Sequence, residues 1–221
     1  MATDYGVLWD MDGVLVDTAE LHFRTWLEAL STYDIPLTRE SFRATFGMNN
    51  AGTLTALLGE APSPELLAEI GERKERQFRQ AIRGQVRPLP GVLPWLERLR
   101  SEGVRQAVAS SAPPANIDVL LNELGLRPFF DVIGSGSDLP AKPDPSLFLQ
   151  VARLIGVPPG RCVVVEDSVA GVQAARRAGM RCLAVTTTNP PHRLGEADVV
   201  VERLDTLPED AFRRLLAPDL R

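Results

Sequence analysis

The chain has 221 residues, of which 44% are hydrophobic and 24% charged, a balance typical of soluble globular proteins. Its formal net charge of −5 argues against a nucleic-acid partner. No apolar run approaches the length of a membrane span and no signal segment opens the chain, so we expect no membrane partner and a cytoplasmic location. We expect Cys162 and Cys182 to be small core residues rather than a disulfide. No exposed interaction segment is apparent, and we expect a monomer.

The first predicted element is a short buried strand, residues 7–9, which ends in two acids. Asp10 and Asp12 are two residues apart, so their side chains share one face while the chain is extended. Two carboxylates at the end of a buried strand repel each other unless they share a proton or a cation, which favours a Mg²⁺ site. The alternative is a simple turn, because Asp and Gly are turn residues.

A block of helices without any strand pattern follows the acids. Apolar residues recur at helical spacing after Thr18, a candidate N-cap. A Ser63-Pro64 pair predicts the start of a longer helix, and a Gly- and Pro-rich segment then predicts a linker. The predicted helices are 18–31, 40–46, 52–58 and 63–82, and the linker is 84–91.

From Val92 onwards, predicted helices alternate with predicted strands. This order is typical of a parallel sheet covered by helices on both faces, with its ligand site beyond the carboxyl ends of the strands. The predicted helices are 92–101, 115–124, 145–154 and 169–178, and the predicted strands are 105–109, 130–133, 162–165, 182–185 and 199–201.

Polar residues stand where four of the predicted strands end or in the loop beyond. Helix N-termini also begin at this edge, which favours an anion. Only two of the 24 basic residues are lysines, and one of them, Lys142, is at this edge. A simple turn would explain each polar segment alone, but it does not explain why four such segments lie at the same edge of the sheet. The residues are Asp10 and Asp12, Ser110 and Ser111, Lys142, and Glu166 and Asp167.

In order and type, these residues resemble the four motifs of the haloacid dehalogenase superfamily of phosphotransferases. Asp10-Met-Asp12-Gly-Val resembles the first motif, Ser110 the second, Lys142 the third and Glu166-Asp167 the fourth. The resemblance implies an α/β fold: a doubly wound, Rossmann-like core with a parallel sheet and a small inserted α-helical cap. We predict the core to comprise residues 1–16 and 87–221, and the cap residues 17–86.

The resemblance also implies roles for the residues at the strand ends. Asp10 is expected to be the nucleophile that forms an aspartyl-phosphate, and Asp12 the general acid and base. The expected cofactor is Mg²⁺, held by Asp10, the Asp12 backbone carbonyl and Asp167. Glu166 is expected either to orient the water shell of the metal or only to support Lys142. The residues expected to bind the phosphoryl group are Ser110, Ser111 and Lys142.

Each of these roles has a plainer alternative. Asp167 and Ser168 could simply cap the following helix, and Ser110 and Ser111 could do the same. Lys142 could be a solvated loop residue.

Residues 17–26 resemble the opening cap helix of the β-phosphoglucomutases, which related sugar-phosphate phosphatases share. The candidate cap residues are Thr18, His22, Asn50 and Lys74. His22 is expected to lie over the active site and contact the substrate or its leaving group, with plain helix packing as the alternative. Lys74 aligns with a cap lysine of the mutases, although it lies in a charged run that is typical of a solvated helix face.

Asn50 stands where the mutases carry an arginine that grips a distal phosphate, and Asn cannot replace that bidentate clamp. We therefore predict a Mg²⁺-dependent phosphatase acting on a small phosphorylated metabolite, a sugar phosphate by class. The alternative is a β-phosphoglucomutase with the same aspartyl-phosphate chemistry. A phospho-receiver regulatory domain is a more remote alternative, because its acceptor normally lies on a later strand.

Overall fold

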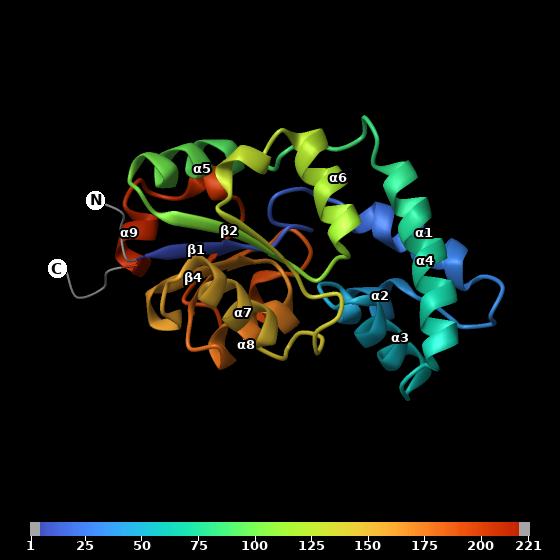
Figure 1. Ribbon diagram of the computed structural model, residues 1–221. Coiled ribbons are helices and arrows are strands. Elements are labelled where there is room, and N and C mark those ends of the chain that lie inside the picture. Colours follow the sequence, from blue (N-terminus) through green and yellow to red (C-terminus); the bar gives the residue numbers. More distant parts are fainter. Residues whose placement is uncertain (1–4, 217–221) are drawn as a thin grey trace.

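A six-stranded parallel sheet organises the computed structural model, which describes residues 5–216 (Figure 1). The strand order is β3-β2-β1-β4-β5-β6, which places the first strand in the middle of the sheet. This topology confirms the predicted fold class. The strands are β1 (Gly6–Trp9), β2 (Arg105–Ser110), β3 (Val132–Ser135), β4 (Cys162–Glu166), β5 (Arg181–Val185) and β6 (Val199–Val201).

Helices cover both faces of the sheet, as Figure 1 shows. Val7 and Trp9 of β1 face one apolar cluster, and Leu8 faces the other, because successive side chains of a strand point to opposite sides. Both faces are buried, so the middle residues of the strands are mostly apolar on either face rather than alternating with polar ones. On the Trp9 side lie α5 (Val92–Ser101), α6 (Pro114–Leu124) and α9 (Ala211–Leu216), and on the Leu8 side lie α7 (Ser146–Ile155) and α8 (Val169–Arg177).

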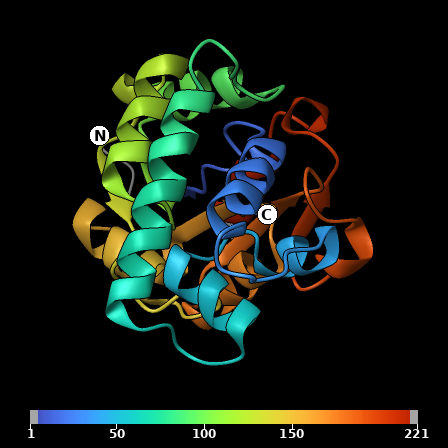
Figure 2. The same ribbon diagram turned by 90° about the vertical axis from the view of Figure 1, so that its right-hand side faces the viewer.

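Four further helices lie beyond the carboxyl ends of the strands, and Figure 2 shows them in front of the sheet. They have an apolar cluster of their own, built around Phe23, Trp26 and Leu54. The far end of the last of them joins the main core through Phe78 and Ile82. The helices are α1 (Ala19–Leu30), α2 (Arg39–Thr45), α3 (Asn50–Leu58) and α4 (Pro64–Ala81).

The chain passes between these helices and the sheet twice, and the two crossings lie side by side. Val16 forms an antiparallel bridge with Pro88, and Leu89 donates its N–H to the carbonyl of Leu15 at 3.0 Å. The division into a core (1–16 and 87–221) and a cap (17–86) stays a prediction, and we use these two names for the two parts below.

Three details differ from the predictions. The strand β3 begins at Val132 rather than at residue 130, because residues 127–129 form a 3₁₀ turn and Asp131 accepts the N–H of Gln106. The helix α9 was not predicted, although its Phe212 packs against Trp9 at 5.8 Å between ring centroids. Thr18 is the N-cap residue of α1, but its hydroxyl does not cap the helix.

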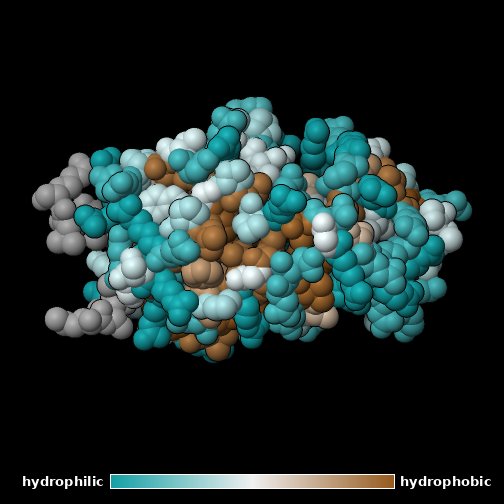
Figure 3. Space-filling model, turned by 90° about the horizontal axis from the view of Figure 1, so that it is seen from above, coloured by the Kyte–Doolittle hydropathy of each residue, from teal (hydrophilic) through white to brown (hydrophobic). Residues whose placement is uncertain are grey.

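The surface above α5 and α6 is mostly hydrophilic, with apolar atoms exposed towards its middle (Figure 3). None of the helices within residues 5–216 has both the length and the apolar character needed to cross a membrane. Cys162 and Cys182 are both buried and unpaired, which confirms that they are core residues.

Candidate active site

The ends of four strands bring the predicted core residues to one edge of the sheet. Asp10 directly follows β1, Ser110 ends β2, Glu166 ends β4, and Lys142 lies in the loop beyond β3. The ammonium of Lys142 donates to Asp10 Oδ1 at 2.6 Å and to Glu166 Oε1 at 2.5 Å. Lys142 is only 2% exposed, so the alternative of a solvated loop lysine is wrong.

Glu166 uses both of its carboxylate oxygens to hold this arrangement. One oxygen accepts the Lys142 ammonium, and the other accepts the N–H groups of Asp167 and Ser168 and the hydroxyl of Ser168. Ser168 also caps α8, since its hydroxyl oxygen accepts the N–H of Gly171. Glu166 therefore supports Lys142 by direct contact.

Asp167 is buried and only half satisfied. Its Oδ2 accepts the hydroxyl of Thr188, but its Oδ1 has no hydrogen-bond partner among residues 5–216. Gly13 permits this placement: its φ is +87°, and a Cβ there would lie 1.9 Å from Asp167 Oδ2. Buried polar atoms without a partner are rare, and this one points to a ligand that the carboxylate holds.

Asp10, Glu166 and Asp167 together offer carboxylate oxygens that lie within 4.8 Å of one another. Oxygen ligands gathered in this way suit a hard divalent cation. Asp10 and Glu166 share the ammonium of Lys142, so a divalent cation would balance the negative charge that remains in the cluster. The cluster and the unpartnered oxygen of Asp167 therefore fit Mg²⁺.

The electrostatics of the cluster agree with this fit. Burial raises the pKa of Asp10 to about 8; the charge of Lys142 opposes this rise, and that of Glu166 adds to it. Burial, with the charges of Glu166 and Asp10, raises the pKa of Asp167 well above its ordinary value. Burial would lower the pKa of Lys142, but Asp10 and Glu166 raise it above its usual range. A bound cation would favour the charged form of both aspartates.

Asp12 faces the cap rather than the carboxylate cluster. It accepts the hydroxyl of Thr18, and His22 Nε2 lies 3.1 Å from its Oδ1. Burial tends to raise the pKa of Asp12, but His22, the Thr18 hydroxyl and Lys74 lower it below its ordinary value. Without a bound cation, the pKa values of the two acids are therefore pushed apart, with that of Asp10 raised and that of Asp12 lowered.

His22 combines packing with contact to the site. Its ring stacks on Phe78 at 3.9 Å between centroids and meets Phe46 edge to face. The same ring contacts Asp12, so His22 packs within the cap and also lies over the site, while its contact with a substrate stays a prediction.

A cavity of about 50 Å³ separates the core from the cap. Ligand pockets commonly measure about 300–1,000 Å³, so this cavity has room for a few waters but not for a larger ligand unless the surrounding groups move. Lys74 and Asn50, both predicted as cap site residues, line it. Its floor consists of Asp10, Asp12 and residues 110–112, and its ceiling of His22, Trp26, Phe42, residues 45–50, Thr53, Lys74 and Glu75.

The two serines after β2 have different partners. Ser110 accepts the N–H of Ala112 with its hydroxyl oxygen, a local contact at the strand end. Ser111 donates its hydroxyl to the carbonyl of Gly47 at 2.7 Å, which joins the core to the cap.

Several residues at the core–cap junction were missed by sequence reasoning. Asn49 caps α3 by accepting the N–H of Gly52, and its amide donates to the carbonyls of Gly136 and Leu139, both at 2.9 Å. A cap residue before a predicted helix is a local signal that could have identified it. No local signal marks Glu75, Asn116 or Thr188, because each gains its contact from a distant segment.

Comparison with known proteins agrees with the geometry. A family model described as haloacid dehalogenase-like hydrolase matches residues 6–179. The chain is 34% identical to the β-phosphoglucomutase of Bacillus subtilis, over 91% of this chain and 90% of that protein. It is 32% identical to a phosphorylated carbohydrates phosphatase of Thermotoga maritima, over 88% of this chain and 91% of that protein.

The structure also resembles a solved β-phosphoglucomutase from Clostridium difficile. The TM-score is 0.86 at 25% sequence identity, and the match covers 97% of each chain. Two chloroplastic relatives from Arabidopsis thaliana are longer proteins, and the chain spans 58% of the length of one and 18% of the other.

Proposed function

The chain belongs to the haloacid dehalogenase-like hydrolase family, and from this premise we propose that it is a Mg²⁺-dependent phosphatase of a small phosphorylated metabolite, a sugar phosphate by class. The observation that carries the proposal is that two acids beyond the same strand have different partners. Asp10 contacts Lys142 beside a carboxylate cluster, while Asp12 contacts His22 of the cap.

In the proposed reaction the carboxylate of Asp10 attacks phosphorus, and the bond to the ester oxygen breaks. Asp12 gives its proton to that oxygen, so the alcohol leaves and an aspartyl-phosphate remains. Asp12 then takes a proton from water, and the oxygen of that water displaces Asp10 from phosphorus. The products are the alcohol and inorganic phosphate, and both carboxyl groups return to their starting states.

In the protein without substrate, the surroundings of Asp12 favour the form that acts in the second step, the hydrolysis of the aspartyl-phosphate. His22 and Lys74 favour the ionised form, which is the base. A phosphate dianion entering beside Asp12 raises its pKa again, because like charges disfavour the ionised form. Substrate binding therefore favours the protonated form of Asp12, which the first step needs.

Lys142 stays charged and faces the carboxylate that receives the phosphoryl group. We expect its ammonium to bind a phosphoryl oxygen together with Ser110 and Ser111, which line the cavity at the neighbouring strand end. Asp10, Asp167 and the Asp12 carbonyl would hold Mg²⁺, and the nearby Glu166 supports Lys142 beside them; the cation would shield the negative charges of nucleophile and phosphate from each other.

A β-phosphoglucomutase is the second candidate, favoured by the relatives of that name. Asn50 argues against it, because the cavity residue at that position offers an amide instead of a guanidinium. The family match leaves the phospho-receiver alternative without support. A cytoplasmic location and a monomeric state stay predictions.

The test is a product analysis with β-glucose 1-phosphate, Mg²⁺ and a trace of β-glucose 1,6-bisphosphate. We expect inorganic phosphate without isomerisation, from this or another sugar monophosphate in a screen. Glucose 6-phosphate forming faster than inorganic phosphate would establish the mutase instead. Release of phosphate from none of the esters would refute the phosphatase.

A further inference from the structure

Two charged residues of α4 lie on its buried face, inside the ceiling of the cavity. Lys74 is 3% exposed and Glu75 is 5% exposed. The Lys74 ammonium donates to Glu75 Oε1 at 2.9 Å and lies 5.3 Å from the ring centroids of both Trp26 and Phe78. The ammonium is thus enclosed by a carboxylate and two aromatic rings, and the alternative of a solvated helix face is wrong for both charged residues.

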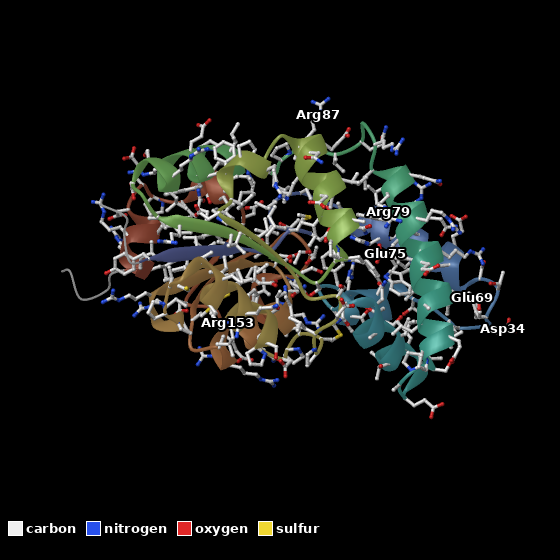
Figure 4. All side chains as sticks on the ribbon, in the orientation of Figure 1. Asp34, Glu69, Glu75, Arg79, Arg87 and Arg153 are labelled. Carbon is white, nitrogen blue, oxygen red and sulfur yellow. The ribbon has the colours of Figure 1, made fainter. Side chains whose placement is uncertain are left out.

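The core fixes the position of Glu75. Its Oε2 accepts the side-chain amide of Asn116 at 2.5 Å, and Asn116 lies fully buried on α6. The carbonyl oxygen of the same amide accepts a guanidinium N–H of Arg79 at 2.7 Å. Figure 4 shows Glu75 and Arg79 reaching from α4 towards the end of α6. The carboxylate is therefore held across the core–cap junction and is not free to swing away.

Charge in the ceiling is balanced. Its ionisable members are His22, Lys74 and Glu75, and His22 contacts Asp12 below it. Burial alone would raise the pKa of Glu75, but Lys74, His22 and the Asn116 amide lower it below its ordinary value. Glu75 is therefore ionised at neutral pH, and it cancels the charge of Lys74.

We propose that Glu75 restricts the site to monophosphate esters whose part distal to the phosphate is uncharged and hydroxylated. This deepens the proposed function and rests on it. A second phosphate under the ceiling would meet the Glu75 carboxylate, and the nearest ammonium is already paired with that carboxylate. A hydroxyl, in contrast, donates to the Glu75 carboxylate and accepts from Lys74, so the pair recognises a polyol without needing a net charge.

The test is calorimetric binding in the presence of Mg²⁺ to the Asp10→Asn protein, which is designed not to turn the ligands over. The probes are two matched pairs: β-glucose 1-phosphate with β-glucose 1,6-bisphosphate, and fructose 1-phosphate with fructose 1,6-bisphosphate. In at least one pair we expect the monophosphate to bind more tightly. Adding Glu75→Gln should shift the Kd ratio towards the bisphosphate, on the order of tenfold.

Glu72→Gln is the matched control, because it makes the same substitution on the same helix at an exposed position outside the cavity lining. It should leave the ratio unchanged. Bisphosphates that bind as tightly as their monophosphates, or monophosphates that do not bind at all, would overturn the proposal. If Glu75→Gln fails to fold, the Kd ratio measured with native Glu75 still tests the proposal, because equal binding of both members of each pair would overturn it.

Phosphate release by the wild-type protein tests the phosphatase activity separately from the role of Glu75. No release from either monophosphate, combined with the expected binding ratio, would count against the phosphatase and support the role of Glu75. Release from both members of a pair at equal kcat/KM would support the phosphatase and count against the role of Glu75.

Discussion

The two halves of the cavity hold their polar groups in different ways. On the core side, the charged groups stand at or just beyond strand ends; Lys142 contacts Asp10 and Glu166 there, while Asp12 contacts His22 of the cap. On the cap side they project from helix faces, and their contacts cross to the other half, as those of His22 and Glu75 do. The core half of the proposed site is therefore built mainly from contacts within the core, whereas the cap half depends on contacts across the junction.

The largest effect is expected from a substitution in the core half, at Asp10. Asp10→Asn removes the nucleophile but keeps the shape of the side chain, and we expect kcat to fall by about 10⁴-fold or more. The control is Asp17→Asn, an exposed aspartate where the chain leaves the core, which should keep near-normal kcat. Phosphate release under saturating substrate measures both. Substantial turnover by Asp10→Asn would sink the assignment.

Removal of the metal should affect the core half alone. We expect EDTA to abolish phosphate release and Mg²⁺ to restore it. Mg²⁺ without substrate should also raise the thermal unfolding temperature, since a ligand at 100 times its Kd stabilises the native state by about 2.7 kcal/mol. Asp167→Asn should lose most of this shift, because the unpartnered oxygen belongs to its carboxylate. An equal shift in the variant would exclude Asp167 as a ligand.

The smallest expected effect tests how the halves are joined. Asn49→Ala removes a helix cap and two bonds to carbonyls of the core, at a cost of about 1–2 kcal/mol in unfolding free energy. We also expect KM to rise severalfold, because the closed cap loses contacts. Ser63→Ala is the matched control: it removes the cap of α4, whose side-chain bond is local. It should lower stability in urea unfolding without changing KM, and an equal KM for both variants would contradict the joining role.

The same contrast explains how far sequence reasoning could go. The core residues were predictable because apolar runs mark strands, parallel order places their ends together, and Asp10, Ser110 and Glu166 stand at those ends. The missed α9 has only six residues, too few for a helical period to stand out, and tertiary packing of Phe212 stabilises it.

In the cap, the rotation of each helix about its axis decides which of its side chains face the cavity. Ile70, Lys74 and Phe78 recur at intervals of four, a pattern that places Lys74 on the apolar face in spite of its charged neighbours. Burial of Glu75 depends on Asn116, a residue of another element, and no local pattern reports such a partner.

The chain leaves the core at Val16 and returns at Pro88, and these two segments are bridged to each other. Because the chain leaves and re-enters the sheet at one point, the segment between them is tied to the core as an insertion with adjacent ends. Segments of this kind can be lengthened, shortened or exchanged without changing the path of the remaining chain. The fold therefore allows the cap to change in length or sequence while the path of the core stays the same.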